Sequence, residues 1–598
     1  MYTNEKHALV LLSLLKAHSV KKIVVSPGST NIPIATAVQN DDFFQVFSAV
    51  DERSAAYMAI GLSQVSGEAV ALSCTGATAS RNYMSALTEA YYRKLPIISI
   101  TSFNGNENIG HLVAQNLDRR VMPNDTVKLN IQVPYINDSR TEWECNTLIN
   151  KALIECRKDG GGPVNINIAS MYSDVFTTKE LPSVRVIKYV NSKNIDDLNI
   201  EVASVGLFIG SHRDFTKTEM LLIEQFCKKN NAVVFCDHTS GYYGDYKIMG
   251  ALVSNNFGPT DSSWRDYVPD LILHIGEVSG DYAGHRVLKE AKTVWRISED
   301  GEIRDLTRKL SLVYHGDISS FLSNVKILVK LNAPSFYEKW KTIDLDFRLK
   351  FKNLNLPFSN IWAASILHNQ LPKNSVISFA ILNSLRCWNF FELDPSIRSF
   401  SNVGGFGIDG CMSTAIGGAL AARDRLHFFI TGDLAFFYDL NSLANRHLPK
   451  NLRIFLINNG GGIEFKNYSH MASEINVDSN ELIAAGGHFN SSSDSSSSIS
   501  GPLERSRNSL AKVWCEKLNF DYYSVCSKED LHLVSDVFVS ESGDRPIIIE
   551  AFTNDWEESL ALKVSSNFEK TTTDKLIQEF KKVLPKKSKE YIKSIIKK

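Results

Sequence analysis

Two apolar segments of this sequence end in polar residues, and a helical segment separates them. The run LHFFIT precedes Gly432 and Asp433, and the run LRIFLI precedes Asn458 and Asn459. A strand, a helix and a second strand in this order form a βαβ unit with parallel strands. Because the carboxyl ends of parallel strands meet at one edge of a sheet, we expect Asp433 and Asn459 to lie close together. The sequence therefore predicts one polar site at this edge.

The predicted site has the chemistry of a magnesium site. The Asp433 carboxylate, the Asn459 amide oxygen and a backbone carbonyl from the turn at 460–462 form an all-oxygen donor set. Mg²⁺ accepts such oxygens while keeping phosphate oxygens and water as its other ligands. Gly432 would let a phosphate approach the backbone. An Asp helix cap and an Asn-Gly turn explain either half alone, whereas the spaced pair favours a metal and diphosphate site.

Strand and helix patterns alternate along the whole chain, which predicts an α/β fold of doubly wound parallel sheets. A chain of 598 residues is long enough for about three or four domains. We expect three, at 1–183, 184–345 and 346–562, followed by a basic tail at 563–598. The central domain contains the segment FIGS but no complete GxGxxG motif. It is therefore expected to be a structural Rossmann-like domain without a nucleotide.

Composition and charge exclude several other classes of protein. A net charge of −1 gives no reason to expect a nucleic-acid partner. The nine cysteines form no CxxC pair, which argues against zinc and a disulfide framework and favours a cytoplasmic location. The N-terminal segment has the pattern of a domain's first helix rather than of a signal peptide, and no apolar run is long enough to span a membrane.

The pattern at the first site resembles the cofactor motif of thiamine diphosphate (ThDP) enzymes. In that family the Asp, the second Asn and a backbone carbonyl two residues later hold Mg²⁺ on the diphosphate. The resemblance assigns these roles to Asp433, Asn459 and the carbonyl of Gly461. Residues around the motif's Asp are expected to bind the cofactor as well: Gly432, Leu434 and Ala435.

The N-terminal half supplies the second motif of a ThDP enzyme. A carboxylic acid that bonds the far nitrogen of the aminopyrimidine ring activates this cofactor, and Glu52 in AVDERSAAYMAIGLS resembles that residue. Gln115 resembles a glutamine that faces the cofactor from the opposite domain. Ile408 resembles the apolar residue wedged under ThDP, and the Phe406 carbonyl would accept a hydrogen bond from the cofactor's amine. Alternatively, Asp51 and Glu52 only charge a helix's first turn.

The resemblance implies a pyrimidine-binding domain at 1–183, a central Rossmann-like domain at 184–345 and a diphosphate- and Mg²⁺-binding domain at 346–562. This order resembles the decarboxylase and acetolactate synthase branch of the family. Within it, VVSPGSTNIPI, LNSL, GIDGCMSTAIGGALAA and GDLAFFYDLNSLAN are similar to the 2-succinyl-5-enolpyruvyl-6-hydroxy-3-cyclohexene-1-carboxylate (SEPHCHC) synthases of menaquinone biosynthesis. This similarity covers most of residues 5–465. It implies decarboxylation of 2-oxoglutarate on ThDP and addition of the resulting carbanion to isochorismate.

The sequence departs from that family at positions where arginines hold the substrates' carboxylates. Removing one such fork from a buried carboxylate costs about 2–5 kcal/mol. Four arginines are missing, at Thr30 or Asn31, within 103–105, at Val403 and near Trp388, where only Arg386 remains close.

We therefore expect a ThDP- and Mg²⁺-dependent carboligase or decarboxylase. Its 2-oxo acid donor would be smaller or less charged than 2-oxoglutarate, and its acceptor is unknown. The alternatives are the SEPHCHC synthase itself and a catalytically silent ThDP-fold regulatory subunit. Glu52, Gln115 and Glu464 are the candidate catalytic residues. The candidate substrate-binding residues are Ser29, Thr30, Asn31, Ser384, Arg386 and His488.

The remaining expectations concern loops, assembly and the C-terminal tail. The serine-rich segment 491–498 would belong to a lid over the cofactor, although His488 beside it could be a solvated loop residue. Glu464 could likewise be an exposed helix residue without a role. The resemblance implies a homodimer or a dimer of dimers whose active sites are shared between subunits. The lysine-rich tail is expected to be a solvated helix, and the alternatives are docking on a neighbouring subunit or on an acidic membrane surface.

Overall fold

The structure of the protein is a computed structural model that describes residues 1–170, 173–195, 198–258, 261–330, 334–474, 482–484, 486 and 501–570. The chain divides into two compact units. The first unit comprises Met1–Tyr189 and Glu302–Val313, and the second comprises Val190–Gly301 and Tyr314–Lys598. Among the described helices, none is both long and apolar enough to cross a membrane.

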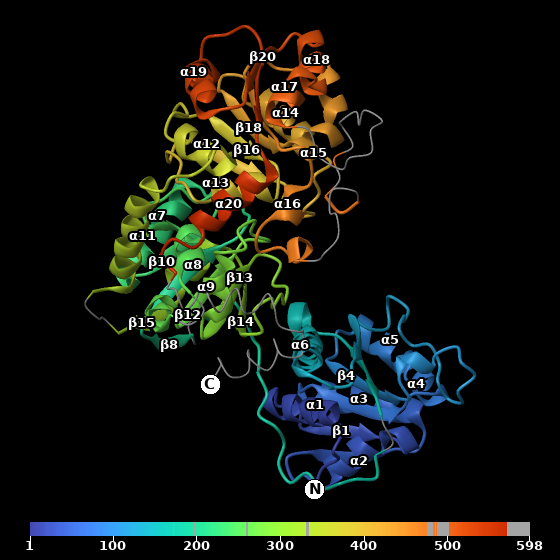
Figure 1. The fold of residues 1–598 in the computed structure, drawn as a ribbon. Coiled ribbons are helices and arrows are strands. Elements are labelled where there is room, and N and C mark those ends of the chain that lie inside the picture. Colours follow the sequence, from blue (N-terminus) through green and yellow to red (C-terminus); the bar gives the residue numbers. More distant parts are fainter. Residues whose placement is uncertain are drawn as a thin grey trace. The chain divides into compact units, whose positions relative to one another are not determined.

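The first unit is built on a six-stranded parallel sheet, here called the N-terminal sheet (Figure 1). Its strand order is β2-β1-β3-β4-β6-β5. The central strands β3 and β4 are almost completely buried, as expected for strands covered on both faces. The strands are β1 Lys22–Val25, β2 Gln45–Ser48, β3 Val70–Thr75, β4 Ile97–Phe103, β5 Leu129–Val133 and β6 Val164–Ala169.

Helices cover both faces of this sheet because successive strand residues point to opposite sides. One apolar core includes Ile23 and packs against α1, α2 and α6, and the other includes Val24 and packs against α3, α4 and α5. The helices are α1 Lys6–Ala17, α2 Ile32–Gln39, α3 Glu52–Ser66, α4 Thr78–Asn82, α5 Met84–Tyr92 and α6 Ser139–Glu155. The Asp138 side chain caps α6, and Gly67, whose positive φ suits glycine, follows the last residue of α3.

The second unit contains a central parallel sheet with neighbouring strands in the order β11-β10-β9-β12-β13. These strands are β9 Val205–Ile209, β10 Val233–Cys236, β11 Lys247–Met249, β12 Leu271–Ile275 and β13 Thr293–Ser298. Strands β8 Asn199–Val202 and β15 Lys326–Val329 form a separate parallel pair. The helices of this region are α7 Lys217–Asn230, α8 Gly250–Asn256, α9 His285–Glu290, α10 Ile318–Asn324 and α11 Phe336–Lys352. Strands β7 Lys188–Asn191 and β14 Leu310–His315 include the points where the two units divide.

The second unit also contains the C-terminal sheet, with the strand order β17-β16-β18-β19-β21-β20. Its strands are β16 Val376–Phe379, β17 Arg398–Ser401, β18 His427–Gly432, β19 Leu452–Asn458, β20 Asp521–Val525 and β21 Ile547–Phe552. The surrounding helices are α12 Asn360–Leu367, α13 Asn383–Trp388, α14 Cys411–Ala421, α15 Asp433–Tyr438, α16 Ile463–Lys466, α17 Pro502–Arg507, α18 Leu510–Lys517, α19 Lys528–Val539 and α20 Asp555–Ser565.

The N-terminal and C-terminal sheets have the same topology. When each sheet is numbered along the chain, both have the strand order 2-1-3-4-6-5. The predicted α/β class with several parallel sheets flanked by helices is therefore confirmed. The boundaries predicted at 183, 345 and 562 stay predictions, because the compact division joins the central and C-terminal sheets in one unit.

We expect the centre of the C-terminal sheet to be the most sensitive place in the second unit. Leu456 on β19 is fully buried, so Leu456→Ala should lower the free energy of unfolding by about 2–5 kcal/mol through lost burial and a cavity. Chemical denaturation followed by fluorescence measures this change. Leu533→Ala is the matched control, because Leu533 is 80% exposed and its loss should change stability by less than about 0.5 kcal/mol. Equal losses in the two variants would contradict the assignment of the core.

Candidate cofactor and active site

The parallel pairing of β18 with β19 brings the two predicted strand ends together. In the register of this pair Gly432 lies opposite Ile457. Asp433 follows as the first residue of α15, and its side chain is only 2% exposed. Its Oδ2 accepts a hydrogen bond of 2.7 Å from the Gly460 backbone N–H, and its Oδ1 accepts one of 2.8 Å from Leu434. A carboxylate thus lies directly beside the glycine turn that follows Asn459.

The turn that follows β19 is ordered by its own polar groups and by a neighbouring segment. Asn459 is buried, and its Oδ1 accepts a hydrogen bond of 3.3 Å from the Gly461 N–H. The Gly462 N–H donates to the Ala484 carbonyl at 2.9 Å. A Cβ added to Gly461 would lie 2.5 Å from that carbonyl oxygen, so this position requires glycine. The described residues 482–484 therefore pack on the turn that carries the predicted metal ligands.

Two buried charged residues behind this edge were missed by the sequence reasoning. Glu550 on β21 accepts a 2.7 Å hydrogen bond from Asn458 Nδ2, and the Ser509 and Tyr522 hydroxyls donate to its other oxygen. Burial raises the pKa of the Glu550 carboxyl. Arg505 on α17 donates to the Asn458 carbonyl. The sequence carries one signal for Glu550, because an acidic residue that interrupts the apolar run PIIIEAF is expected to be buried.

The residues present fit a diphosphate held through a metal ion. Added Cβ atoms on four glycines around this edge would meet nothing within 4 Å, so the backbone here faces open space. Among the described residues, no group of three or more His, Cys, Asp or Glu side chains could hold a metal. One carboxylate, one amide oxygen and one carbonyl leave coordination places for phosphate oxygens, as Mg²⁺ prefers. The four glycines are Gly404, Gly405, Gly410 and Gly432.

The loop before α14 carries the two residues expected beneath the cofactor. Ile408 is half-buried and packs on the apolar core of the C-terminal sheet. Phe406 has a φ of 54°, in the left-handed region that non-glycine residues rarely adopt. Its ring lies 5.9 Å from that of Tyr282. Strained backbone of this kind is concentrated at functional sites, which agrees with the role expected for the Phe406 carbonyl.

The structure joins Glu464 and Arg386, which the sequence suggested separately. The Arg386 guanidinium binds the Glu464 carboxylate in a two-point ion pair, at 2.6 and 2.9 Å. Asn383 accepts a further hydrogen bond from Arg386, and Ser384 between them is buried. Although burial acts to lower the pKa of Arg386, the contact with Glu464 raises it overall. Glu464 is therefore a paired residue rather than a solvated one, and Arg386 has less charge to offer a substrate.

Glu52 lies where an α-helix of the first unit begins. Asp51 caps α3 by accepting the Arg53 N–H, so Glu52 is not needed as the cap. The Glu52 carboxylate instead accepts a hydrogen bond of 3.2 Å from Asn82 Nδ2. Asn82 is the last residue of α4. The role of Glu52 towards the cofactor stays a prediction.

The other predicted residues of the first unit differ in their accessibility. Thr30 and Asn31 are buried, and they donate to the Ser102 and Ser26 carbonyls at 2.8 and 3.0 Å. Both side chains therefore hold the loop after β1 in place, whereas Ser29 is exposed. Gln115 is exposed and has a φ of 62°, another strained position.

Some predicted features lie outside the described residues. They are His488, the serine-rich segment 491–498 and the part of the basic tail after residue 570.

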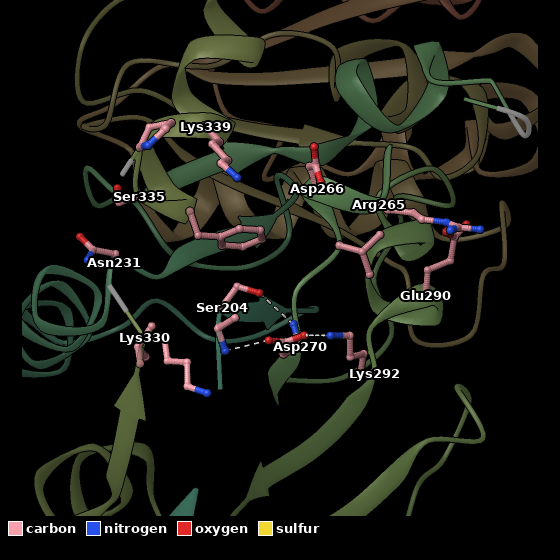
Figure 2. Close-up of a pocket in the computed structure, with 15 residues that line it drawn as sticks. Ser204, Asn231, Arg265, Asp266, Asp270, Glu290, Lys292, Lys330, Ser335 and Lys339 are labelled. Carbon is pink, nitrogen blue, oxygen red and sulfur yellow. Dashed lines mark hydrogen bonds and ion pairs between the residues drawn. The ribbon is translucent and has the colours of Figure 1, made fainter. Parts of the chain in front are cut away.

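A pocket of about 400 Å³ in the second unit lies at the wrong edge of its sheet for an active site (Figure 2). Ser204, Asp270 and Lys292 line it, and each comes just before the start of a strand, namely β9, β12 and β13. Ligand sites of parallel sheets occur at the carboxyl ends instead. The Asp270 carboxylate is also already paired with Lys292 and with the Ala203 N–H.

Comparison with known proteins shows the family to which this chain is similar. Residues 6–122 match the family described as thiamine pyrophosphate enzyme, N-terminal TPP binding domain. Three relatives are each named 2-succinyl-5-enolpyruvyl-6-hydroxy-3-cyclohexene-1-carboxylate synthase. The protein of Bacteroides fragilis is 30% identical over 581 residues, covering 94% of this chain and 99% of the relative. That of Phocaeicola vulgatus is 32% identical over 587 residues, with 94% and 98% covered, and that of Bacteroides thetaiotaomicron 30% over 580, with the same coverage.

The parallel-sheet fold and the N-terminal match define an enzyme that depends on thiamine diphosphate, also called thiamine pyrophosphate. This class typically holds its cofactor with a divalent metal such as Mg²⁺ and acts on small molecules. Within it, the chain belongs to the family of SEPHCHC synthases, which it matches over nearly its full length.

If Asp433 and Asn459 hold the metal, removing the carboxylate should remove the charge bridge to the diphosphate. Asp433→Ala is therefore expected to abolish Mg²⁺-dependent binding of thiamine diphosphate in isothermal titration calorimetry. Asp424→Ala is the control, because Asp424 has a side chain that is 82% exposed. An unchanged affinity in Asp433→Ala would remove the metal assignment.

Proposed function

We propose that this chain catalyses the SEPHCHC synthase reaction, in which 2-oxoglutarate is decarboxylated and the remaining unit is added to isochorismate. The observation that carries the proposal is similarity over 94% of the chain to synthases of that name. This similarity supports the synthase better than the smaller donor expected from the sequence. The intact residues at both cofactor motifs argue against a silent subunit.

The chain's own residues would bind the cofactor and control one proton. When bound, thiamine diphosphate supplies an electron sink for the loss of CO2 from a 2-oxo acid. Asp433, Asn459 and the Gly461 carbonyl would hold the metal and diphosphate. Glu52 would hold a proton at the ring nitrogen of the aminopyrimidine, with Asn82 orienting its carboxylate. Glu464 is bound by Arg386, which suits a positioning role better than that of a free acid.

A second candidate is a carboligase with a smaller or less charged donor. It is favoured by the burial of Thr30 and Asn31, which stand where the family has a substrate arginine and are engaged in internal hydrogen bonds. It is also favoured by Arg386, whose guanidinium is already paired with a carboxylate. These observations leave fewer cations for a substrate that carries two carboxylates.

Product formation distinguishes the two candidates. With thiamine diphosphate and Mg²⁺ present, we expect CO2 release from 2-oxoglutarate to be coupled to consumption of isochorismate, with SEPHCHC detected by mass spectrometry. The same assay with pyruvate and other 2-oxo acids is the control. Turnover of a smaller 2-oxo acid with none of 2-oxoglutarate would reject the synthase and favour the second candidate.

We also propose that two subunits share each active site, as the family resemblance implies. If they do, Glu52→Gln and Asp433→Ala proteins should each be inactive but recover activity when mixed under conditions that exchange subunits. One site of a mixed dimer then carries both substitutions and the other carries neither. Glu52→Gln alone should still bind the cofactor while losing about 100-fold or more in rate. Absence of recovery at every mixing ratio would show that each site is built within one chain.

A further inference from the structure

Arg119 is a buried arginine whose charged group has no hydrogen-bond partner. It is only 5% exposed, and none of its three side-chain nitrogens donates to any of the described residues. Buried guanidinium groups are normally paired, because an unpartnered buried charge is costly. Burial lowers the pKa of Arg119 to about 10, so the group still carries its charge at neutral pH. A partner that is absent from the chain itself would account for this arrangement.

The surroundings hold the guanidinium in one place without neutralising it. Its carbon lies 4.8 Å from the centre of the Phe103 ring, a stacking contact that arginine favours. A Cβ on Gly76 would lie 2.8 Å from the guanidinium carbon, so the group rests against this glycine. The Arg119 carbonyl accepts a hydrogen bond of 3.0 Å from Asn130 Nδ2, which fixes the backbone. The guanidinium is thus pre-organised and leaves its donors unused.

The position of Arg119 in the fold is that of a ligand site. Gly76 directly follows β3 and Phe103 ends β4, the third and fourth strands of the N-terminal sheet. In the C-terminal sheet, which has the same strand order, Asp433 directly follows the third strand and Asn458 ends the fourth. The edge that presents a carboxylate for a metal in one sheet therefore presents a guanidinium in the other.

Arg119 also lies at one of the places where the family's substrate arginine is missing. Phe103, on which Arg119 stacks, begins the segment 103–105, where the sequence analysis places one of the missing arginines. Two neighbouring side-chain oxygens, Asn104 Oδ1 and Asn116 Oδ1, are likewise buried without a partner. Asn116 is bound to the same turn, since its Nδ2 donates to the Gly105 carbonyl at 3.0 Å. The turn at 103–105 and the segment that contacts it, 116–119, thus hold one cation and two acceptors without a partner among the described residues.

We propose that Arg119 binds a carboxylate of the substrate and thereby replaces an arginine lost elsewhere in the site. This inference rests on the proposed function, because it assigns a contact within that active site. The carboxylate belongs either to the 2-oxo acid donor or to the acceptor, since both are carboxylic acids. Two parallel hydrogen bonds from the guanidinium fork would fix its orientation.

The test compares Arg119→Met and Arg119→Lys with Arg120→Met. Arg120 is the matched control because it is adjacent, exposed and already paired with Asp118 at 2.8 and 3.0 Å. Affinities for 2-oxoglutarate and for isochorismate are measured separately by calorimetry on the holoenzyme. We expect Arg119→Met to weaken binding of one of them by about 10- to 100-fold, and Arg119→Lys to weaken it less. Arg120→Met should leave the affinities for both acids unchanged. None of the three substitutions should change the affinity for thiamine diphosphate.

Thermal unfolding distinguishes this role from a structural one. Without substrate, Arg119→Met should have an equal or higher melting temperature than the wild type, because it removes an unpaired buried charge. The carboxylate that Arg119 binds should raise the melting temperature of the wild type but not of Arg119→Met. A lower melting temperature with unchanged affinity for both acids would overturn the proposal. Binding that depends on Arg119 without any SEPHCHC formation would instead reject the proposed reaction while retaining the carboxylate contact.

Discussion

The parallel pairing of strands is the constraint on which the rest of this structure depends. Parallel neighbours place all their carboxyl ends at one edge, so residues far apart in the chain become neighbours there. The pairing of β18 with β19 lets the Asp433 carboxylate reach the Gly460 N–H at 2.7 Å. Helices on both faces keep the strands buried, so only the loops after them can carry chemistry. Asp433 and Asn459 directly follow β18 and β19, and Arg119 stacks on Phe103 at the end of β4.

Sequence was sufficient wherever a short local pattern determines the structure. Apolar runs separated by helical segments predicted parallel sheets, and the rule about strand ends predicted that Asp433 and Asn459 would lie together. The positions of Glu52 and Phe406 rested on the resemblance to thiamine diphosphate enzymes. The structure adds that Asn82 binds the Glu52 carboxylate and that the Phe406 backbone is strained. The four missing arginines favoured a smaller or less charged donor. The similarity along the whole chain is instead to SEPHCHC synthases.

Contacts between segments distant in sequence could not be predicted in this way. Glu550 and Arg505 act on Asn458 from elements that follow it by many residues, and nothing local indicates that they meet. The pairing of Arg386 with Glu464 is of the same kind, because neither residue type at its position implies the other. Comparison with a family at single positions detects an arginine only at the same position. It does not detect a guanidinium that comes from another loop.

The shared strand order of the N-terminal and C-terminal sheets has a consequence for how such enzymes diversify. The same topological position carries an acid and amides in one sheet and an arginine beside a glycine in the other. The same strand order, here called the backbone frame, can therefore carry either a negative or a positive charge at its edge. Each copy of the frame can therefore change the charge at its edge without any change to the strands that support it.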